Sequence, residues 1–454
     1  MKIGLLPLYL KLYDDNAPAA RPRLEDFYAT VAARLEMAGD EVIRTPFCRL
    51  AEEFSATVTS LEAAGAEVLM TLHMAYSPSL ECIDALAATR LPIVVLDVTE
   101  TKEFGPDASP TEIMYNHGIH GVMDMCHMLR RREIPFAIAA GHISSDAPER
   151  ALGLARAALA ARSLAGTRTL IFGEPFSGMG DFLIPDEEMR SRFGVTVVRP
   201  SFDSVASTAE SITEEETEEE LACDRETYRA QEDFDPREYR ESVRAKLTLR
   251  RVLEKENGNA FTFNFNAKTG FPATPFLGAS EGMAAGYGYA GEGDTLTASF
   301  LSALLRTYPE ANFTEFFCPD WDTGTLFLSH MGECNLRVAD ETPILTRIAK
   351  KYASPENPYM AAVRMKGGKG VYVNICRQKD GFVLIITEGE MLSVPTDNFT
   401  RSVRGWLRVN GSTAEFLEKY SAAGGTHHGI FVYGATAAEM HFFGALLGMR
   451  VLAL

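Results

Sequence analysis

Four side chains in the C-terminal half of this 454-residue chain have the types and settings of metal ligands. Glu292 stands in the glycine-rich segment GYGYAGEGD and Glu315 in NFTEFF. His330 ends the apolar run TGTLFLSH, and His428 follows the glycines of AGGTHHGIF. Each stands at an expected strand end or turn, where folded domains present ligands. Two carboxylates with two imidazoles suit an octahedral Mn²⁺, Co²⁺ or Mg²⁺ that leaves room for substrate oxygens.

On spacing alone, other interpretations of these residues stay open. A single Glu in a glycine-rich loop often serves as a negative charge near a helix N-terminus. A histidine at a strand end is often a polar surface residue, or a core residue whose ring nitrogens already have hydrogen-bond partners. GYGYAGEGD also has a superficial likeness to a phosphate-binding loop. It lacks the GK[ST] ending and the dinucleotide spacing, so we reject a nucleotide site.

The N-terminal third of the chain alternates short apolar runs with amphipathic segments. KIGLLPLYL, EVLMTL, PIVVLDV and PFAIAAG have the composition of buried parallel strands. Helical patterns lie between them, and an alanine-rich helix follows at about residues 148–164. This alternation predicts a doubly wound parallel sheet in a first α/β domain, residues 1–165.

Two further domains are expected. TRTLIFG, VTVVRP and AFTFNF predict a second Rossmann-like α/β domain over residues 166–309. Within it, we interpret the glutamate-dense segment 213–225 as a solvated helix face that Thr213 caps. From about residue 311, TGTLFLSH, KGVYVNICR, GFVLIITEG and GIFVYG predict strands. The predicted fold is therefore two doubly wound α/β domains followed by a β-rich domain, residues 310–454.

Composition limits the partners and the compartment. The formal net charge of −18 argues against nucleic acid and anionic membranes as partners. No apolar run reaches the roughly 18 residues of a membrane span. MKIGLLPLYL is interpreted as a first strand and not as a signal peptide. The seven cysteines are scattered without a CxxC motif, which fits reduced thiols in the cytoplasm.

The motifs around the four candidate ligands resemble those of the L-arabinose isomerase family. GYGYAGEGDTLTASFLSALL is similar to the segment with the family's first catalytic, metal-binding Glu. NFTEFF and LFLSHMGEC resemble the segment with its second Glu and first metal-binding His, and AGGTHHGIF resembles its last ligand segment. The resemblance implies that Glu292 and Glu315 are catalytic and bind the metal with His330 and His428. It implies Mn²⁺ as the cofactor, with Co²⁺ or Mg²⁺ as alternatives.

Weaker matches run through the rest of the chain in the same order. Phe265 in TFNF matches a substrate-contacting aromatic residue of the family. NHGIHGVMD resembles a family segment with a substrate-contacting His, which corresponds to His120 here. His427 is the neighbour of the matched ligand and is expected to contact the sugar. In isomerases of this type the N-terminal domain reaches into the site of a neighbouring subunit. The resemblance therefore implies a homo-oligomer, with a hexamer as one form.

The chain also departs from the family pattern. Leu8 stands in a region where the family has a sugar-contacting Gln, and Phe316 and Phe317 stand where it has Asp-Tyr. FGEPFSGMGDF, which contains Phe176, is closer to the fucose isomerases in its Ser-Gly-Met-Gly. The chain also stops earlier than the family usually does. We keep Leu8 and Phe176 as expected substrate-binding residues, while L-arabinose itself is in question as the substrate.

The sequence thus predicts a metal-dependent aldose–ketose isomerase that acts on a small sugar through an enediol. One glutamate serves as base and the other as acid, without an assignment of which does which. Glu333, three residues after His330, is a candidate to orient that ligand. Two alternatives stay open: an isomerase of a deoxy or modified sugar, and a non-catalytic metal- and sugar-binding sensor on the same scaffold.

Overall fold

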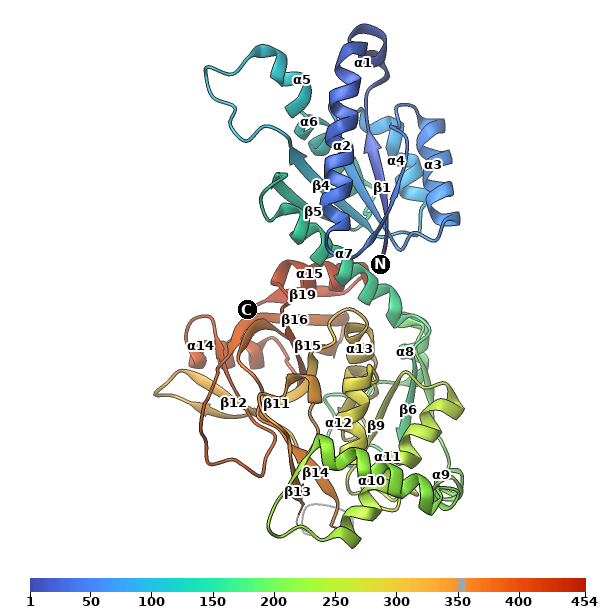
Figure 1. The fold of residues 1–454 in the computed structure, drawn as a ribbon, viewed down its shortest axis with the longest axis vertical. Coiled ribbons are helices and arrows are strands. Elements are labelled where there is room, and N and C mark those ends of the chain that lie inside the picture. The colour runs from blue at the N-terminus through green and yellow to red at the C-terminus, as the bar shows by residue number, and fades with distance from the viewer. Residues whose placement is uncertain (349–356) are drawn as a thin grey trace. The chain divides into compact units, whose positions relative to one another are not determined.

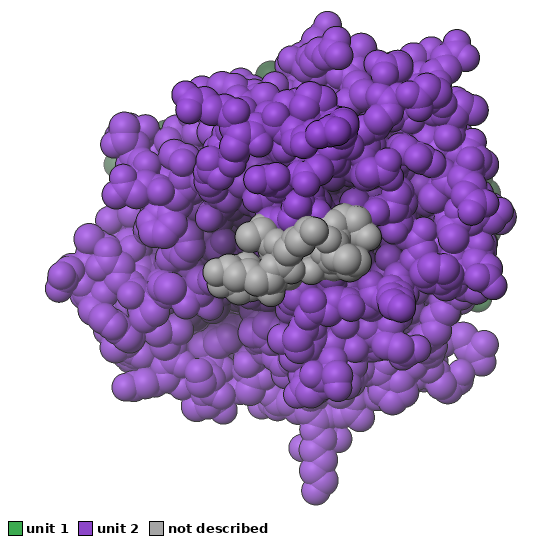
Figure 2. Space-filling model, turned by 90° about the horizontal axis from the view of Figure 1, so that it is seen from below, with its two compact units in different colours: residues 1–159 green, residues 160–454 purple. Residues whose placement is uncertain are grey.

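The chain folds into two compact units, residues 1–159 and residues 160–454 (Figure 2). The structure is a computed structural model that describes residues 1–348 and 357–454. Among these residues, no helix has both the length and the apolar character of a membrane span.

The smaller unit is built on one parallel sheet with the strand order β2-β1-β3-β4-β5 (Figure 1). Its strands are β1 (Lys2–Leu8), β2 (Glu41–Arg44), β3 (Val68–His73), β4 (Ile93–Thr99) and β5 (Phe136–His142). β1 and β3 are buried along almost their whole length, which explains their continuous apolar runs. The predicted doubly wound parallel sheet is confirmed.

Helices connect and cover these strands. They are α1 (Lys11–Asn16), α2 (Arg21–Glu36), α3 (Ala51–Ala63), α4 (Ser79–Ala88), α5 (Ile113–Asn116), α6 (Ile119–Arg131) and α7 (Ala147–Leu164). Side chains of α3, α4 and α6 share one apolar core with β1, β3 and β4. The sheet of this unit is therefore covered along three neighbouring strands.

The larger unit begins with a second parallel sheet, which has the order β10-β9-β6-β7. Its strands are β6 (Arg168–Phe172), β7 (Thr196–Val198), β9 (Ala260–Phe263) and β10 (Gly288–Gly291). The chain runs from β6 outward to β7 and then returns to the other side of β6. In such sheets ligands bind outside the carboxyl ends of the strands, near the point where the order reverses. Glu292 follows β10 at this edge.

The helices of this part include the predicted glutamate-rich helix. They are α8 (Asp186–Phe193), α9 (Phe202–Glu210), α10 (Glu214–Thr227), α11 (Pro236–Glu256), α12 (Phe276–Ala285) and α13 (Thr295–Leu305). Thr213 caps α10 as expected and forms a capping box with Glu216. Most of α10 is solvated as predicted, but Thr217 and Asp224 are buried, and Asp224 pairs with the buried Lys246 of α11.

The β-rich part of the larger unit contains a closed barrel. The order is β15-β18-β11-β12-β17-β16, and pairing of β15 with β16 closes the ring. The strands are β11 (Ala311–Asp320), β12 (Thr325–Ser329), β15 (Gly368–Gln378), β16 (Gly381–Met391), β17 (Gly405–Val409) and β18 (His428–Tyr433). The prediction of a β-rich C-terminal region is confirmed.

The remaining elements flank the barrel. They are β19 (Arg450–Ala453), which extends the sheet beside β16, the three-stranded sheet of β14 (Tyr359–Ala362), β13 (Ile344–Arg347) and β8 (Arg229–Ala230), and the helices α14 (Thr413–Ala422) and α15 (Ala437–Leu446). One large apolar core joins the barrel to side chains of α11 and α12. The parallel sheet and the barrel therefore belong to one packed body.

Candidate metal centre

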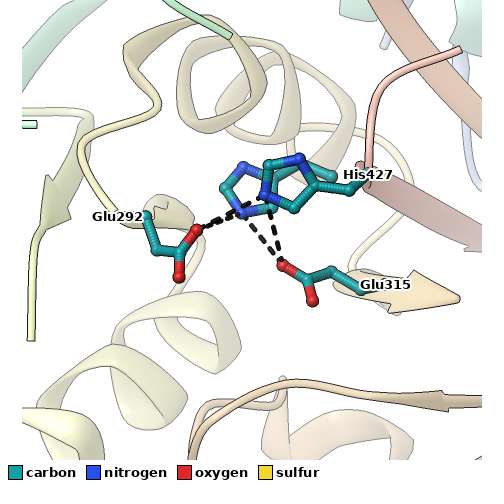
Figure 3. A group of neighbouring side chains, drawn as sticks. Glu292, Glu315 and His427 are labelled. Carbon is teal, nitrogen blue, oxygen red and sulfur yellow. Dashed lines mark hydrogen bonds and ion pairs between the residues drawn. The ribbon is translucent and has the colours of Figure 1, made fainter. Parts of the chain in front are cut away.

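Two carboxylates and two imidazoles from distant parts of the larger unit point toward one another (Figure 3). Glu292 follows β10, Glu315 belongs to β11, and His427 and His428 stand at the start of β18. Each offers an oxygen or nitrogen atom within 4.8 Å of the others. His330, after β12, joins them through its Nε2 atom, which lies 3.4 Å from Glu315 Oε1.

The register of the barrel explains why Glu315 meets the histidines. β11 lies between β12 and β18 and pairs antiparallel with both. Glu315 is directly opposite His428 on one side and Ser329 on the other. His330 follows Ser329 in the chain. The pairing of β11 with its two neighbours therefore brings together a carboxylate and two imidazoles that are far apart in sequence.

Glu292 reaches the site through an uncommon backbone conformation. Its φ of 64° lies in the left-handed region, which few residues with a side chain adopt. The surrounding chain holds it there: the amide of Glu292 donates to Phe263 O at 3.0 Å, and its carbonyl accepts from the Phe176 amide at 2.8 Å. Gly291 is also required, because a Cβ atom there would lie 2.5 Å from the His330 ring. Such local strain is typical of functional sites.

A carboxylate holds each imidazole through its Nδ1 atom. The Nδ1 atoms of His428, His330 and His427 donate to Asp294 (2.9 Å), Glu333 (2.6 Å) and Asp181 (2.6 Å), respectively. Nδ1 carries the hydrogen in each case because an ionised carboxylate only accepts. The Nε2 atoms then face the two glutamates. Metal-binding histidines are oriented in the same way by carboxylates.

The Nε2 atom of His428 is the best test of whether a cation fits here. It lies 3.0 Å from Glu315 Oε1 and 3.6 Å from Glu292 Oε2. It is buried, yet its geometry gives it no hydrogen-bond partner. Among the described residues, the ionic partners of both glutamates are histidines, without a lysine or arginine. A buried imidazole nitrogen between two carboxylates, able to give up its proton to a metal, fits a divalent cation.

The electrostatics agree with two ionised glutamates. Burial opposes the charge of Glu292, but its hydrogen bond with His427 and the nearby His428 imidazole lower its pKa to about 2. Burial also opposes the charge of Glu315, whose pKa is nevertheless lowered, chiefly by His330. Burial disfavours the imidazolium forms, yet the carboxylates around them raise the pKa of His427 to about 9 and that of His428 well above its ordinary value. A bound metal would displace these protons.

Aromatic rings form the walls of the site. Phe182 stacks on His428 with the ring centres 5.1 Å apart. The edge of Phe313 meets His330 at 4.8 Å and His428 at 5.0 Å. These walls exclude water from one side, and a low local dielectric strengthens every charge interaction inside.

The other residues predicted from the sequence divide between the two units. The rings of Phe176 and Phe265 lie 5.6 Å apart, and Phe176 bonds to the backbone of Glu292, so both stand beside the site. Leu8 and His120 belong to the smaller unit. Leu8 is fully buried at the end of β1, while His120 is exposed on α6.

Two carboxylates of the site, Asp294 and Asp181, are not predicted from the sequence. Asp294 has two functions, since one oxygen caps α13 at the Thr297 amide and the other holds His428. An Asp before an apolar helix is a recognisable N-cap, but only the structure shows the second function. Asp181 lies in a loop between β6 and α8 and carries no sequence signal.

Comparison with known proteins agrees with this arrangement. Residues 186–308 match the family model "L-arabinose isomerase central domain", and residues 310–450 match "L-arabinose isomerase C-terminal domain". The two matched segments meet at residues 308–310, between α13 and β11, and hold all five converging side chains. They span well over half of the chain.

Curated relatives match over most of their length. The L-arabinose isomerase of Mycolicibacterium smegmatis is 26% identical over 85% of this chain and 79% of its own length. That of Shouchella clausii is 22% identical over 93% of this chain and 88% of its own length. A solved solute-binding protein with bound D-allose is 11% identical over 67% of this chain and 91% of its own, with a TM-score of 0.19, too low to bear on the fold. The chain belongs to the L-arabinose isomerase family, whose members are aldose–ketose isomerases.

Proposed function

We propose that this protein is a divalent-metal-dependent aldose–ketose isomerase of a small sugar. Glu292, Glu315, His330 and His428 would hold the cation, with Mn²⁺ as the first candidate and Co²⁺ or Mg²⁺ as alternatives. The observation that carries the proposal is the buried, unpartnered His428 Nε2 between two ionised carboxylates. A bound cation would polarise the sugar carbonyl and the adjacent hydroxyl.

The two glutamates supply the proton chemistry. Conversion of an aldose to a ketose moves one proton from C2 to C1, while O2 loses a proton and O1 gains one. Because Glu292 and Glu315 are both ionised, one can accept the C2 proton and return it to C1 through an enediol, and the other can exchange the oxygen proton. The isomerisation is balanced by these proton transfers and needs no other reactant. Either glutamate can take either part.

Most of the remaining predicted residues would bind the sugar. This is supported by the hydrogen bond of His427 with Glu292, by the bond of the Phe176 amide to the Glu292 carbonyl, and by the contact of the Phe176 ring with that of Phe265. Leu8 is fully buried, so we propose no contact of its side chain with the sugar. For His120 of the smaller unit, we propose that it acts at the site of a neighbouring copy, as the family resemblance implies. The protein would then be a cytoplasmic homo-oligomer of three-domain chains, with boundaries near residues 165 and 309. His120→Ala should impair turnover and leave the metal content unchanged; loss of metal would contradict this assignment.

The experiment that tests the function is reconstitution with metals. The protein is stripped with a chelator, supplied with Mn²⁺, Co²⁺, Mg²⁺ or Zn²⁺, and incubated with a panel of aldoses in D₂O. Proton NMR should show ketose formation only after metal is restored, with deuterium at the transferred position. The panel includes L-arabinose, deoxy sugars and other pentoses and hexoses, because the sequence departs from the family near the sugar. Tight metal binding without any conversion would favour a sugar-binding sensor.

A further inference from the structure

The loop of residues 173–185, between β6 and α8, contacts three members of the metal centre. The Phe176 amide donates to the Glu292 carbonyl, and Phe182 stacks on the His428 ring. Asp181 holds His427. This loop includes the Ser-Gly-Met-Gly stretch, residues 177–180, singled out in the sequence.

Asp181 fixes its histidine at two points. One oxygen, Oδ2, accepts from the His427 amide at 3.0 Å and from the ring Nδ1 at 2.6 Å. The two bonds restrict both the backbone and the side-chain torsions of His427. Burial opposes the charge of Asp181, but the hydrogen bonds from His427 keep the pKa of this carboxyl below its ordinary value. Asp181 is therefore an ionised acceptor over the physiological range.

The position of His427 differs from that of the two buried imidazoles. With Nδ1 bound to Asp181, its Nε2 lies 3.4 Å from Glu292 Oε2 and 3.9 Å from Glu315 Oε1. The His427 side chain is 36% exposed, whereas that of His428 is fully buried. His427 therefore presents part of its side chain to solvent while its Nε2 lies beside the two carboxylates. A sugar from solution can contact this atom while its carbons lie against Glu292.

We propose that Asp181 is a positioning residue for the isomerisation, which holds His427 so that its Nε2 binds a sugar hydroxyl beside Glu292. The ligand class is a polyhydroxylated substrate, because an imidazole nitrogen in this position exchanges hydrogen bonds with a hydroxyl group. Without Asp181 the ring is free to turn about its side-chain torsions, and the hydroxyl loses a partner of fixed direction. This proposal rests on the proposed isomerase function.

Kinetics of the metal-loaded enzyme test the consequence for catalysis. Asp181→Asn and Asp181→Ala should lower kcat/KM by about 10–100-fold, with the bound metal still stoichiometric, as is usual when an orienting carboxylate is removed. Asp186→Asn is the matched control, since Asp186 is an acid five residues further along the chain whose ion pair is with exposed Arg199. Unchanged kcat/KM in both Asp181 variants would overturn the proposal.

A double-mutant cycle separates positioning from general damage to the fold. If Asp181 acts through His427, then Asp181→Asn should cause no further loss in the His427→Ala background. Additive losses in the double variant would show that Asp181 acts elsewhere, and the proposal would fail.

A crystal structure of Asp181→Ala tests whether Asp181 positions His427 without the need for an activity measurement. The His427 ring should leave Glu292 while His428 and His330 keep their positions. A ring that stays in place would contradict the proposal even if the enzyme is active. If the wild-type protein converts no aldose, the isomerase function fails, whereas the movement of His427 still decides whether Asp181 positions it.

Discussion

The larger unit contains two clusters of converging carboxylates, and they neutralise their charge in different ways. In the first, Glu220 and Asp224 of α10 meet Glu281 of α12, with one oxygen of each within 4.8 Å of the others. In the second, Glu292 meets Glu315. Lys246 lies at the centre of the first cluster, with Nζ 3.0 Å from Glu220, 2.5 Å from Asp224 and 2.7 Å from Glu281.

The difference shows how to recognise a site that needs a cation from solution. Buried carboxylates are costly unless a positive charge compensates them. Lys246 supplies that charge permanently: burial alone would lower its pKa, but Glu281, Asp224 and Glu220 raise it. The second cluster has imidazoles instead, and each already uses one nitrogen on another carboxylate. The first cluster is complete without a ligand, whereas the second presents lone pairs to a ligand.

The largest effect should come from the same substitution made in each cluster. Glu315→Gln removes a base and a metal ligand, and should lower kcat by a factor of about 10²–10⁴, the usual contribution of a positioned acid or base. Glu281→Gln is the matched control in the first cluster and should keep most of kcat while lowering the unfolding midpoint. Steady-state ketose formation and urea unfolding measure the two effects. Equal losses of kcat in both variants would remove the distinction between the clusters.

The second effect concerns Lys246, the cation of the first cluster. Lys246→Met keeps the length of the side chain but leaves the buried Asp224 without its cation, while Glu220 and Glu281 keep their contacts with Arg250. Loss of the buried pair should cost about 3–5 kcal/mol of unfolding free energy, as for other broken buried pairs. Lys255 is exposed near the end of the same helix, so Lys255→Met should change stability by less than about 0.5 kcal/mol. Urea unfolding of both variants provides the comparison. A fully stable Lys246→Met protein would show that the carboxylates become protonated at little cost.

Much of the fold could be predicted because its signals are local. β1, β3 and β4 are continuous apolar runs, and such runs between helices indicate a parallel sheet. The hairpin of β15 and β16 joins adjacent strands. The closure of the barrel could not be predicted, since β11 pairs with β18 more than a hundred residues away and no local pattern specifies that partner. The burial of Asp224 on α10 could not be predicted for the same reason, because its partner Lys246 lies on another helix.

The same difference between local signals and distant contacts applies to the site. The residue types at 292, 315, 330 and 428 suggested ligands, and Glu333 was suggested for His330 because it is only three residues away. The direction of each imidazole depends on carboxylates that are mostly distant: Asp294 is 134 residues from His428, and Asp181 is 246 residues from His427. Residue type can suggest a ligand, but its tautomer and direction are set by contacts between distant segments.

A third effect distinguishes the clusters by their response to added metal. Mn²⁺ at 100 times its Kd should stabilise the stripped wild-type protein by about 2.7 kcal/mol, since a ligand of the folded state stabilises it by mass action. The same increment should persist in Lys246→Met and disappear in His428→Ala. Thermal unfolding with and without Mn²⁺ measures it. An increment that survives in His428→Ala would place the metal elsewhere.

The smallest effect is a pH dependence that only the second cluster should show. The pKa values of His427, about 9, and of His428 are raised, so these imidazoles keep their protons until the pH exceeds the usual range for histidine. The ionic contacts of His427 therefore stabilise the metal-free protein fully below about pH 6.5 and fade as the pH rises through about 9. Mn²⁺ competes with the protons of its own ligands His330 and His428, whose pKa values are also raised, so its Kd should fall as the pH rises above about 6.5, by at most about tenfold per pH unit for each proton released. Lys246 stays charged throughout, because its pKa is raised above an already high value. Titration calorimetry at several pH values measures the trend, and a Kd that is constant with pH would mean that the metal ligands carry no protons in the free protein.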